Sequence, residues 1–249
     1  MEPFLRRTLS VTQRVLRQLQ HDKRLIMLSM VVPVSVIYIL YIFFDSLNNP
    51  FLDVNAYVFP LGAYIVHFLT FVLTAIVLVR ERITETLPRM MVNGYQQLEI
   101  ILGYLLAYTT LATAQSLLVL GEITWLFELE YDLATLASVY VVMWLLAMIS
   151  MAMGIFVSNF ARNEGQVFPF IPLVILPSIF LSGMIMSIEA LPEWAQALSL
   201  LSPVYYSTEA LHGLVAGNSL WEEGAAVLSL PLYGLVVLIL ASLTLRDKA

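Results

Sequence analysis

Six uncharged, apolar stretches constrain what this 249-residue chain can fold into. The hydrocarbon core of a bilayer is about 30 Å thick, and a helix needs about 20 apolar residues to cross it. The stretches that meet this length are 25–44, 61–79, 100–121, 133–157, 167–188 and 226–245. Strands of a membrane β-barrel would be shorter and would alternate in polarity. The sequence therefore predicts an all-α integral membrane protein with six transmembrane helices, folded as one domain over residues 1–249.

The composition excludes several other classes of protein. Hydrophobic residues make up 60% of the chain and charged residues 12%, whereas soluble domains carry about 25% charged residues. A mean hydropathy of +0.85 leaves too little polar surface for a soluble enzyme or a nucleic-acid-binding protein. The chain has no cysteine, which excludes disulfides and thiolate metal sites.

The basic residues lie on one side of the predicted bundle. All 12 Lys and Arg precede the first stretch, follow the sixth, or lie in the connections after the second and the fourth. The connections on the other side hold most of the acidic residues and no basic one. By the positive-inside rule, the basic side faces the cytoplasm, and an even number of spans places both termini there.

Two cytoplasmic segments have patterns of their own. Residues 4–22 predict an interfacial amphipathic helix, because one helical face carries Leu5, Leu9, Thr12, Leu16 and Leu19. The connection 80–98 places Arg82, Glu85 and Arg89 at i+3 and i+4 spacings, which favours a short helix. Its apolar residues suit docking onto another protein. The alternative is an ordinary charged loop whose apolar residues enter the interface.

The connection before the sixth stretch predicts an outer hairpin over residues 189–215. Two short helices, 190–201 and 205–215, are expected on either side of Ser202-Pro203. Aromatic residues within it suit the headgroup level of the outer leaflet. Because backbone at that depth must be helical or covered, we expect a re-entrant helical pair.

Residues for chemistry are scarce in this sequence. It contains neither an H-E-x-x-H motif nor a P-loop, so we expect no metal site, no catalytic residue and no cofactor in this chain. No Asp or Glu lies deep in a predicted span, which argues against an ion-coupled carrier and favours energy from a partner. Candidates to line a substrate pathway are Tyr64, His67, Phe68, Phe71, Glu122 and Phe180. Packing or lipid contact is the alternative for each of them.

Two sets of motifs lie in the segments that connect the predicted spans and at the adjoining span ends. The first, in the cytoplasmic connection, is Glu81-Arg82, Thr86-Leu87, Arg89 and Glu99-Ile100-Ile101-Leu102-Gly103. The second is Phe180-Leu181-Ser182-Gly183, Leu191-Pro192, Trp194 and Ser202-Pro203-Val204-Tyr205. Together they resemble the type-two ABC transporter permeases, a family of drug, antibiotic and lipid exporters, over nearly the whole chain. Glu85 and Pro88 depart from the family pattern, which usually has Gly and Glu there.

This resemblance implies the membrane subunit of an ATP-driven exporter with a lipophilic substrate, located in a prokaryotic plasma membrane. Its partners would be two copies of a separate ABC ATPase, which carry ATP and Mg, and a second permease copy, identical or closely homologous. The coupling contact to the ATPase would comprise Arg80, Glu81, Arg82, Thr86, Leu87, Arg89 and Met90. The second and fifth spans would line the pathway. Alternatives are a non-transporting sensor or scaffold, and an ion-coupled carrier or channel.

Overall fold

The computed structural model describes residues 2–47 and 54–244, and every regular element within them is helical. In chain order the elements are α1 (Glu2–His21), α2 (Lys23–Leu47), α3 (Val54–Ile83), α4 (Thr86–Val92), α5 (Gln97–Leu126), α6 (Leu133–Ser158), η1 (Glu164–Val167), α7 (Phe170–Phe180), η2 (Ile188–Ala190), α8 (Glu193–Ser199), α9 (Pro203–Val215) and α10 (Gly224–Thr244). The predicted all-α membrane class is confirmed, since five of these helices are long and apolar enough to cross a bilayer: α2, α3, α5, α6 and α10.

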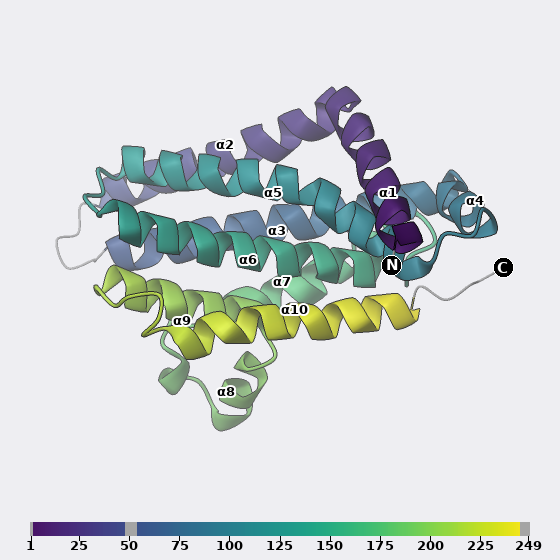
Figure 1. Ribbon diagram of the computed structural model, residues 1–249. Coiled ribbons are helices and arrows are strands. Elements are labelled where there is room, and N and C mark those ends of the chain that lie inside the picture. Colours follow the sequence, from purple (N-terminus) through teal and green to yellow (C-terminus); the bar gives the residue numbers. More distant parts are fainter. Residues whose placement is uncertain (1, 48–53, 245–249) are drawn as a thin grey trace.

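The long helices run side by side, with α3 and α6 at the centre (Figure 1). Glycine allows this central pair to approach closely. A Cβ at Gly154 of α6 would lie 2.6 Å from the carbonyl oxygen of Phe71 on α3. By contrast, α2 and α10 are mostly exposed along their apolar length, as expected of helices at the rim of a membrane bundle.

The bundle has two chemically different ends. At one end lie α1, α4 and the C-terminal ends of α3, α6 and α10 (Figure 1). We call it the basic end, because it carries every Lys and Arg within the described residues: Arg6, Arg7, Arg14, Arg17, Lys23, Arg24, Arg80, Arg82, Arg89 and Arg162. We call the opposite end, where α3, α6 and α10 begin, the acidic end. The basic residues Arg246 and Lys248 lie outside the described residues.

The fifth expected span, 167–188, differs from the prediction. Only its first residue belongs to the single-turn η1, and its helical part is α7, a helix of 11 residues. At 1.5 Å per residue α7 is about 16 Å long, about half of a bilayer core. Pro169 precedes it, and the chain turns after Phe180 at Gly183, whose φ of +78° favours glycine. Apolar composition alone therefore overestimated the length of this helix.

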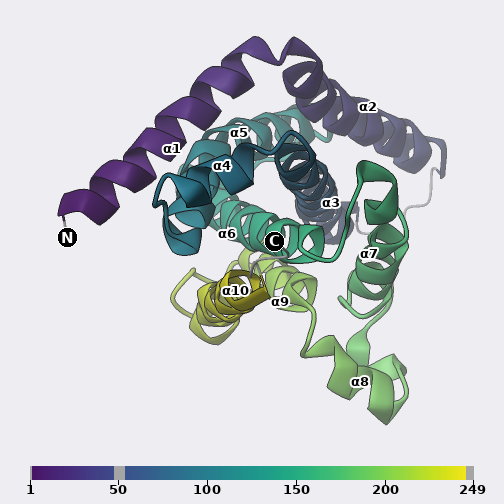
Figure 2. The same ribbon diagram turned by 90° about the vertical axis from the view of Figure 1, so that its right-hand side faces the viewer.

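The outer hairpin forms two helices at the predicted positions, but they differ in burial. α8 stands away from the bundle in both views (Figures 1 and 2). α9 packs into the bundle against α3, α6 and α10, with Val204, Leu211 and Leu214 at most 1% exposed. One member of the pair is thus part of the core. Its placement relative to a bilayer stays a prediction.

The amphipathic α1 crosses the basic end and packs against α5 (Figure 2). Its buried face is Thr8, Val11, Val15 and Leu19, and a Cβ at Gly103 of α5 would lie 2.6 Å from Val11. Of the predicted apolar face only Leu19 is buried, while Leu5 and Leu9 are 54% and 58% exposed. The apolar arc is therefore wide enough to contact the bundle with one part and lipid with the other.

Candidate functional site

The candidate site is the junction that Arg80, Glu81 and Arg82 form at the end of α3. Successive helical residues point about 100° apart, so these three side chains reach three different elements. Arg80 Nε lies 2.9 Å from Glu164 Oε1 of η1, in a pair that is half exposed. We use the name α3 junction for these three residues and their partners.

Glu81 connects α3 to α1 from a buried position. Its side chain accepts a hydrogen bond from Gln18 Nε2 at 2.7 Å and from Arg14 Nη1 at 3.2 Å. Arg14 also donates to the hydroxyl of Tyr104 on α5 and lies over its ring. Burial of the guanidinium lowers the pKa of Arg14, but Tyr104 and Glu81 outweigh burial and raise it. Three helices thus meet around one charged pair.

Arg82 connects α3 to the end of α6. Its Nη1 donates to the carbonyl oxygens of Ser158 at 2.7 Å and Ala161 at 3.1 Å, and its Nη2 donates to Asn159 Oδ1 at 3.1 Å. A cation there satisfies carbonyl groups that the last helical turn leaves open. Asn159 Nδ2 in turn donates to the carbonyl oxygen of Ala241 on α10, at 3.0 Å. The α3 junction therefore extends to α10.

Next to this junction, α4 presents one outward face. Leu87 is 3% exposed and anchors the helix, while Val92 is 89% exposed. The residues at i, i+3, i+4 and i+7 on the exposed face are Glu85, Pro88, Arg89 and Val92. Because Glu85 and Arg89 pair only with each other, at 3.4 Å, this face has no other charged contact within the described residues.

The predicted coupling residues therefore divide into two groups. Arg80, Glu81, Arg82 and Leu87 make contacts within the chain, whereas Arg89 is exposed and Thr86 and Met90 are partly exposed. The sequence analysis indicated the connection 80–98 but did not single out Pro88 or Val92 as coupling residues. Pro88 lies three residues after Glu85 and Val92 three residues after Arg89, and this i+3 spacing was the signal that could have identified them.

Both ends of α4 are fixed by backbone geometry. Glu85, where the family pattern has Gly, adopts a left-handed conformation with φ 60°. After α4 the chain turns at Gly94, whose carbonyl oxygen accepts from Arg7 Nη1 of α1 at 2.6 Å. Helix α1 is thus hydrogen-bonded both to the turn after α4 and to the C-terminal end of α3.

Of the candidate pathway residues, Tyr64 and His67 on α3 lie together. His67 is completely buried, and its Nδ1 lies 2.7 Å from Ser150 Oγ of α6. The Tyr64 ring centroid is 6.1 Å from that of His67, and its hydroxyl donates to the carbonyl oxygen of Ile175 on α7 at 3.0 Å.

The other pathway candidates are distributed more widely. Phe71 is fully buried against α6, Phe68 is partly buried, and Phe180 is 56% exposed at the end of α7. Glu122 lies on α5, one turn from its end at Leu126, near the acidic end. Phe68 and Phe71 share α3 with Tyr64 and His67, whereas Phe180 and Glu122 come from other helices.

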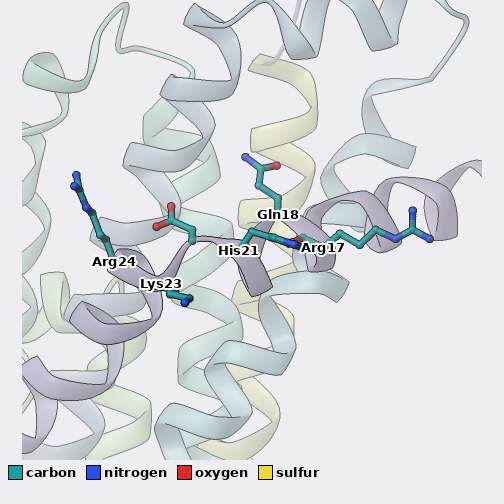
Figure 3. Close-up of a pocket in the computed structure, with 6 residues that line it drawn as sticks. Arg17, Gln18, His21, Lys23 and Arg24 are labelled. Carbon is teal, nitrogen blue, oxygen red and sulfur yellow. The ribbon is translucent and has the colours of Figure 1, made fainter.

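The bend between α1 and α2 forms an open depression of about 760 Å³. It is lined by Arg17, Gln18, His21, Asp22, Lys23 and Arg24. Arg17 and Arg24 extend to opposite sides of the bend rather than toward a common point (Figure 3). Diverging cations of this kind suit a layer of anionic headgroups better than one bound ligand.

Comparison with known proteins identifies the family of this chain. Residues 6–215 match the ABC-2 type transporter family, and the chain belongs to that family. It thus contains the membrane domain of the ABC-2 type transporters, as the motifs predicted.

Individual relatives are more distant. The chain is 26% identical over 182 residues to the probable multidrug ABC transporter permease YbhR of Escherichia coli, over 70% of this chain and 49% of that protein. It is 27% identical over 151 residues to the probable permease YbhS of the same organism, over 59% of this chain and 39% of YbhS. ABC transporter G family member 20 of Dictyostelium discoideum is 22% identical over 182 residues, over 71% and 25% of the two chains. The chain thus spans about half or less of these relatives.

Proposed function

We propose that this chain is the membrane subunit of an ATP-driven exporter that moves a lipophilic substrate out of the cytoplasm or the inner leaflet. The observation that carries the proposal is the outward face of α4, which lies directly beside the α3 junction. A short helix with an exposed apolar residue and a charged rim suits docking into a groove on another protein. Two copies of a separate ABC ATPase, which hold ATP and Mg, would provide that groove.

The contacts of the α3 junction support a route for the movement. A push on α4 would reach α3 through the short connection at Glu85, then α1 through Glu81, and α6 and α10 through Arg82 and Asn159. Because charged hydrogen bonds hold these helix ends together, they would shift as a unit. Hydrolysis on the partner would then drive the bundle, without an ATPase site in this chain.

The orientation follows from the charges. With the basic end in the cytoplasm, both termini and α4 are cytoplasmic, where ATP and its ATPase are found. The diverging cations of the bend between α1 and α2 would lie in the headgroup layer of the inner leaflet. The protein would then be a multi-pass protein of a prokaryotic plasma membrane.

A second permease copy would complete the pathway. α2 and α7 flank α3 on one side of the bundle (Figure 2), and both expose large apolar residues, among them Ile39 at 63% and Leu173 at 66%. An identical or closely homologous copy facing this side would enclose a passage lined by α3 and α7. Tyr64 and Phe180 come from these two helices and support a lipophilic substrate, as does the multidrug name of YbhR.

The test is purification of the chain with its cognate ATPase. A double variant combines Arg89→Glu, which reverses a charge, with Val92→Glu, which adds one. It should abolish co-purification and substrate-stimulated hydrolysis, because both residues lie on the outward face of α4. The matched control is Arg162→Glu, an exposed arginine at the same end.

If the double variant keeps full stimulated hydrolysis, the assignment of α4 is wrong. Transport that continues without the ATPase would instead identify a carrier or a channel. A chain that binds the ATPase but transports nothing in a substrate screen would be a sensor or scaffold.

A further inference from the structure

A cavity of about 540 Å³ lies between the start of α3, the segment 182–189 and α9. Its volume is within the range of sites that hold drug-sized molecules. The cavity is separate from α4 and from the α3 junction, which lie at the opposite end of α3. Figure 1 shows the start of α3 and the C-terminal part of α9 at the same end of the bundle.

The turn after α7 creates this space. Ser182 Oγ donates to the carbonyl oxygen of Ile179 at 2.9 Å and accepts from the backbone N–H of Met184 at 3.2 Å. With Gly183 in the left-handed region, Met184 is directed into the core at 1% exposure. The segment 182–189 and α9 both line the cavity that lies between them.

The lining of the cavity combines acidic and aromatic side chains with aliphatic ones and with His212 of α9. Glu189 of η2 and Glu209 of α9 contribute carboxylates, and Tyr57 and Tyr205 contribute rings. Neither Lys nor Arg is among the lining residues that the structure describes. Burial raises the pKa of Tyr205, and the nearby charges of Glu209 and Glu189 add to that effect. The charges of both carboxylates thus affect the hydroxyl of the same tyrosine.

A buried hydroxyl gives the independent indication of a ligand. Thr208 lines the cavity, is 2% exposed, and its Oγ1 has no hydrogen-bond partner among the described residues. Buried polar groups are nearly always paired, so one without a partner needs an explanation. An N–H group bound in the cavity would supply the partner, because a hydroxyl oxygen can accept.

We propose that this cavity binds a lipophilic organic ammonium ion. The ammonium group lies near the carboxylates of Glu189 and Glu209 and donates to Thr208 Oγ1, while the apolar body contacts the two tyrosine rings. A metal ion is a poorer occupant, since no group of three metal-binding side chains occurs among the described residues. The inference concerns equilibrium binding to this chain alone and does not depend on the ATPase.

The experiment compares two probes of the same shape. 1-Naphthalenemethylammonium and the uncharged 1-naphthalenemethanol are titrated against the full chain in phosphatidylcholine nanodiscs without ATP, with empty nanodiscs subtracted. We expect saturable binding of the ammonium and weaker binding of the alcohol. Glu209→Gln or Glu189→Gln should weaken ammonium binding about fivefold each, the effect of one partly solvated charge. Neither should change binding of the alcohol.

Two further variants separate this site from general surface charge. Thr208→Val keeps the shape of the side chain and should weaken ammonium binding, whereas Glu193→Gln, on the exposed α8 outside the cavity, should leave it unchanged. Each variant is accepted only if its melting temperature matches that of the parent.

A repeat in nanodiscs that contain phosphatidylethanolamine identifies the source of the ammonium. Lower apparent affinity there assigns the site to a lipid headgroup, and unchanged affinity assigns it to a free amine. Equal binding of both probes, or unchanged ammonium affinity in the Glu189 and Glu209 variants, would overturn the proposal. Failure here would leave the α4 assignment intact, because that test uses ATP hydrolysis.

Discussion

Arg14 of α1 and Glu81 of α3 form an ion pair with an Nη1–Oε2 distance of 3.2 Å, and the Glu81 side chain is only 4% exposed. The pair joins a helix that crosses the basic end of the bundle to the helix that leads into α4. This acid of the cytoplasmic motif is therefore turned toward the protein and not toward a partner. Its energetic role can be measured directly.

Glu81→Ala should lower the free energy of unfolding by about 2 kcal/mol, since it leaves Arg14 partly buried without its carboxylate. Glu81→Gln should cost less, because the amide can still accept from Gln18. The control is Glu85→Ala, whose ion pair with Arg89 is more than 70% exposed on both sides and should contribute less than about 0.5 kcal/mol. Denaturant titration in mild detergent measures all three. Equal losses at Glu81 and Glu85 would contradict the connecting role of Glu81.

Arg82 and Asn159 should be energetically coupled, because they share a hydrogen bond and hold the ends of three helices. Arg82→Ala should cost about 2 kcal/mol by leaving the carbonyl groups of Ser158 and Ala161 unpaired. In a double-mutant cycle with Asn159→Ala, we expect an interaction energy of at least about 0.5 kcal/mol. Additive losses would show that the contacts to α6 and α10 are independent.

Replacement of Glu85 by glycine should stabilise the folded protein. A left-handed conformation costs a non-glycine residue about 1–2 kcal/mol, and glycine removes this cost. The greater conformational freedom of glycine in the unfolded chain offsets part of the resulting stabilisation. Glu85→Gly should therefore raise the free energy of unfolding by up to about 1 kcal/mol, whereas the β-branched Glu85→Val should lower it. Thermal melts of the two variants against the parent decide the point. A lower melting temperature for the glycine variant would argue against a left-handed residue here.

Two glycine-to-alanine changes should have opposite effects. In Gly154→Ala the new Cβ meets the backbone of Phe71 at 2.6 Å, so α3 and α6 must separate and we expect a loss of about 2 kcal/mol. In Gly121→Ala nothing lies within 4 Å of the Cβ, and the higher helix propensity of alanine should stabilise the fold by up to about 1 kcal/mol. Fluorescence-detected size-exclusion melts provide the comparison. Similar effects of the two changes would mean that Gly154 is not a close contact.

Several features could be predicted from local sequence because their causes are local. Long apolar runs determine that α2, α3, α5, α6 and α10 can cross a bilayer, and Ser202-Pro203 marks the boundary between α8 and α9. The glycine of the family pattern at position 85 also indicated a local backbone feature, since glycine suits the left-handed conformation that Glu85 adopts there. The candidate site could be located from its motifs in the same way.

The direction of each side chain in that site could not be predicted from spacing. Glu81, Arg82 and Arg89 look alike as charges in a cytoplasmic connection, yet two of them bond within the chain and one is exposed. The difference depends on Gln18 and Asn159, which lie far away in the sequence. Similarly, α1 has an apolar arc wider than one contact, so only packing against α5 selects Val11 and Val15 for burial.

By itself, then, the sequence determined the membrane class, the family and the separation of basic from acidic ends, because hydropathy and charge are sums over neighbouring residues. Tertiary structure decided that α7 is short, that α9 belongs to the core, and that Thr208 lines an acidic cavity. It also decided which face of α4 points outward. These features depend on which distant residues come within a few ångströms of each other, and that information is absent from any local window of the chain.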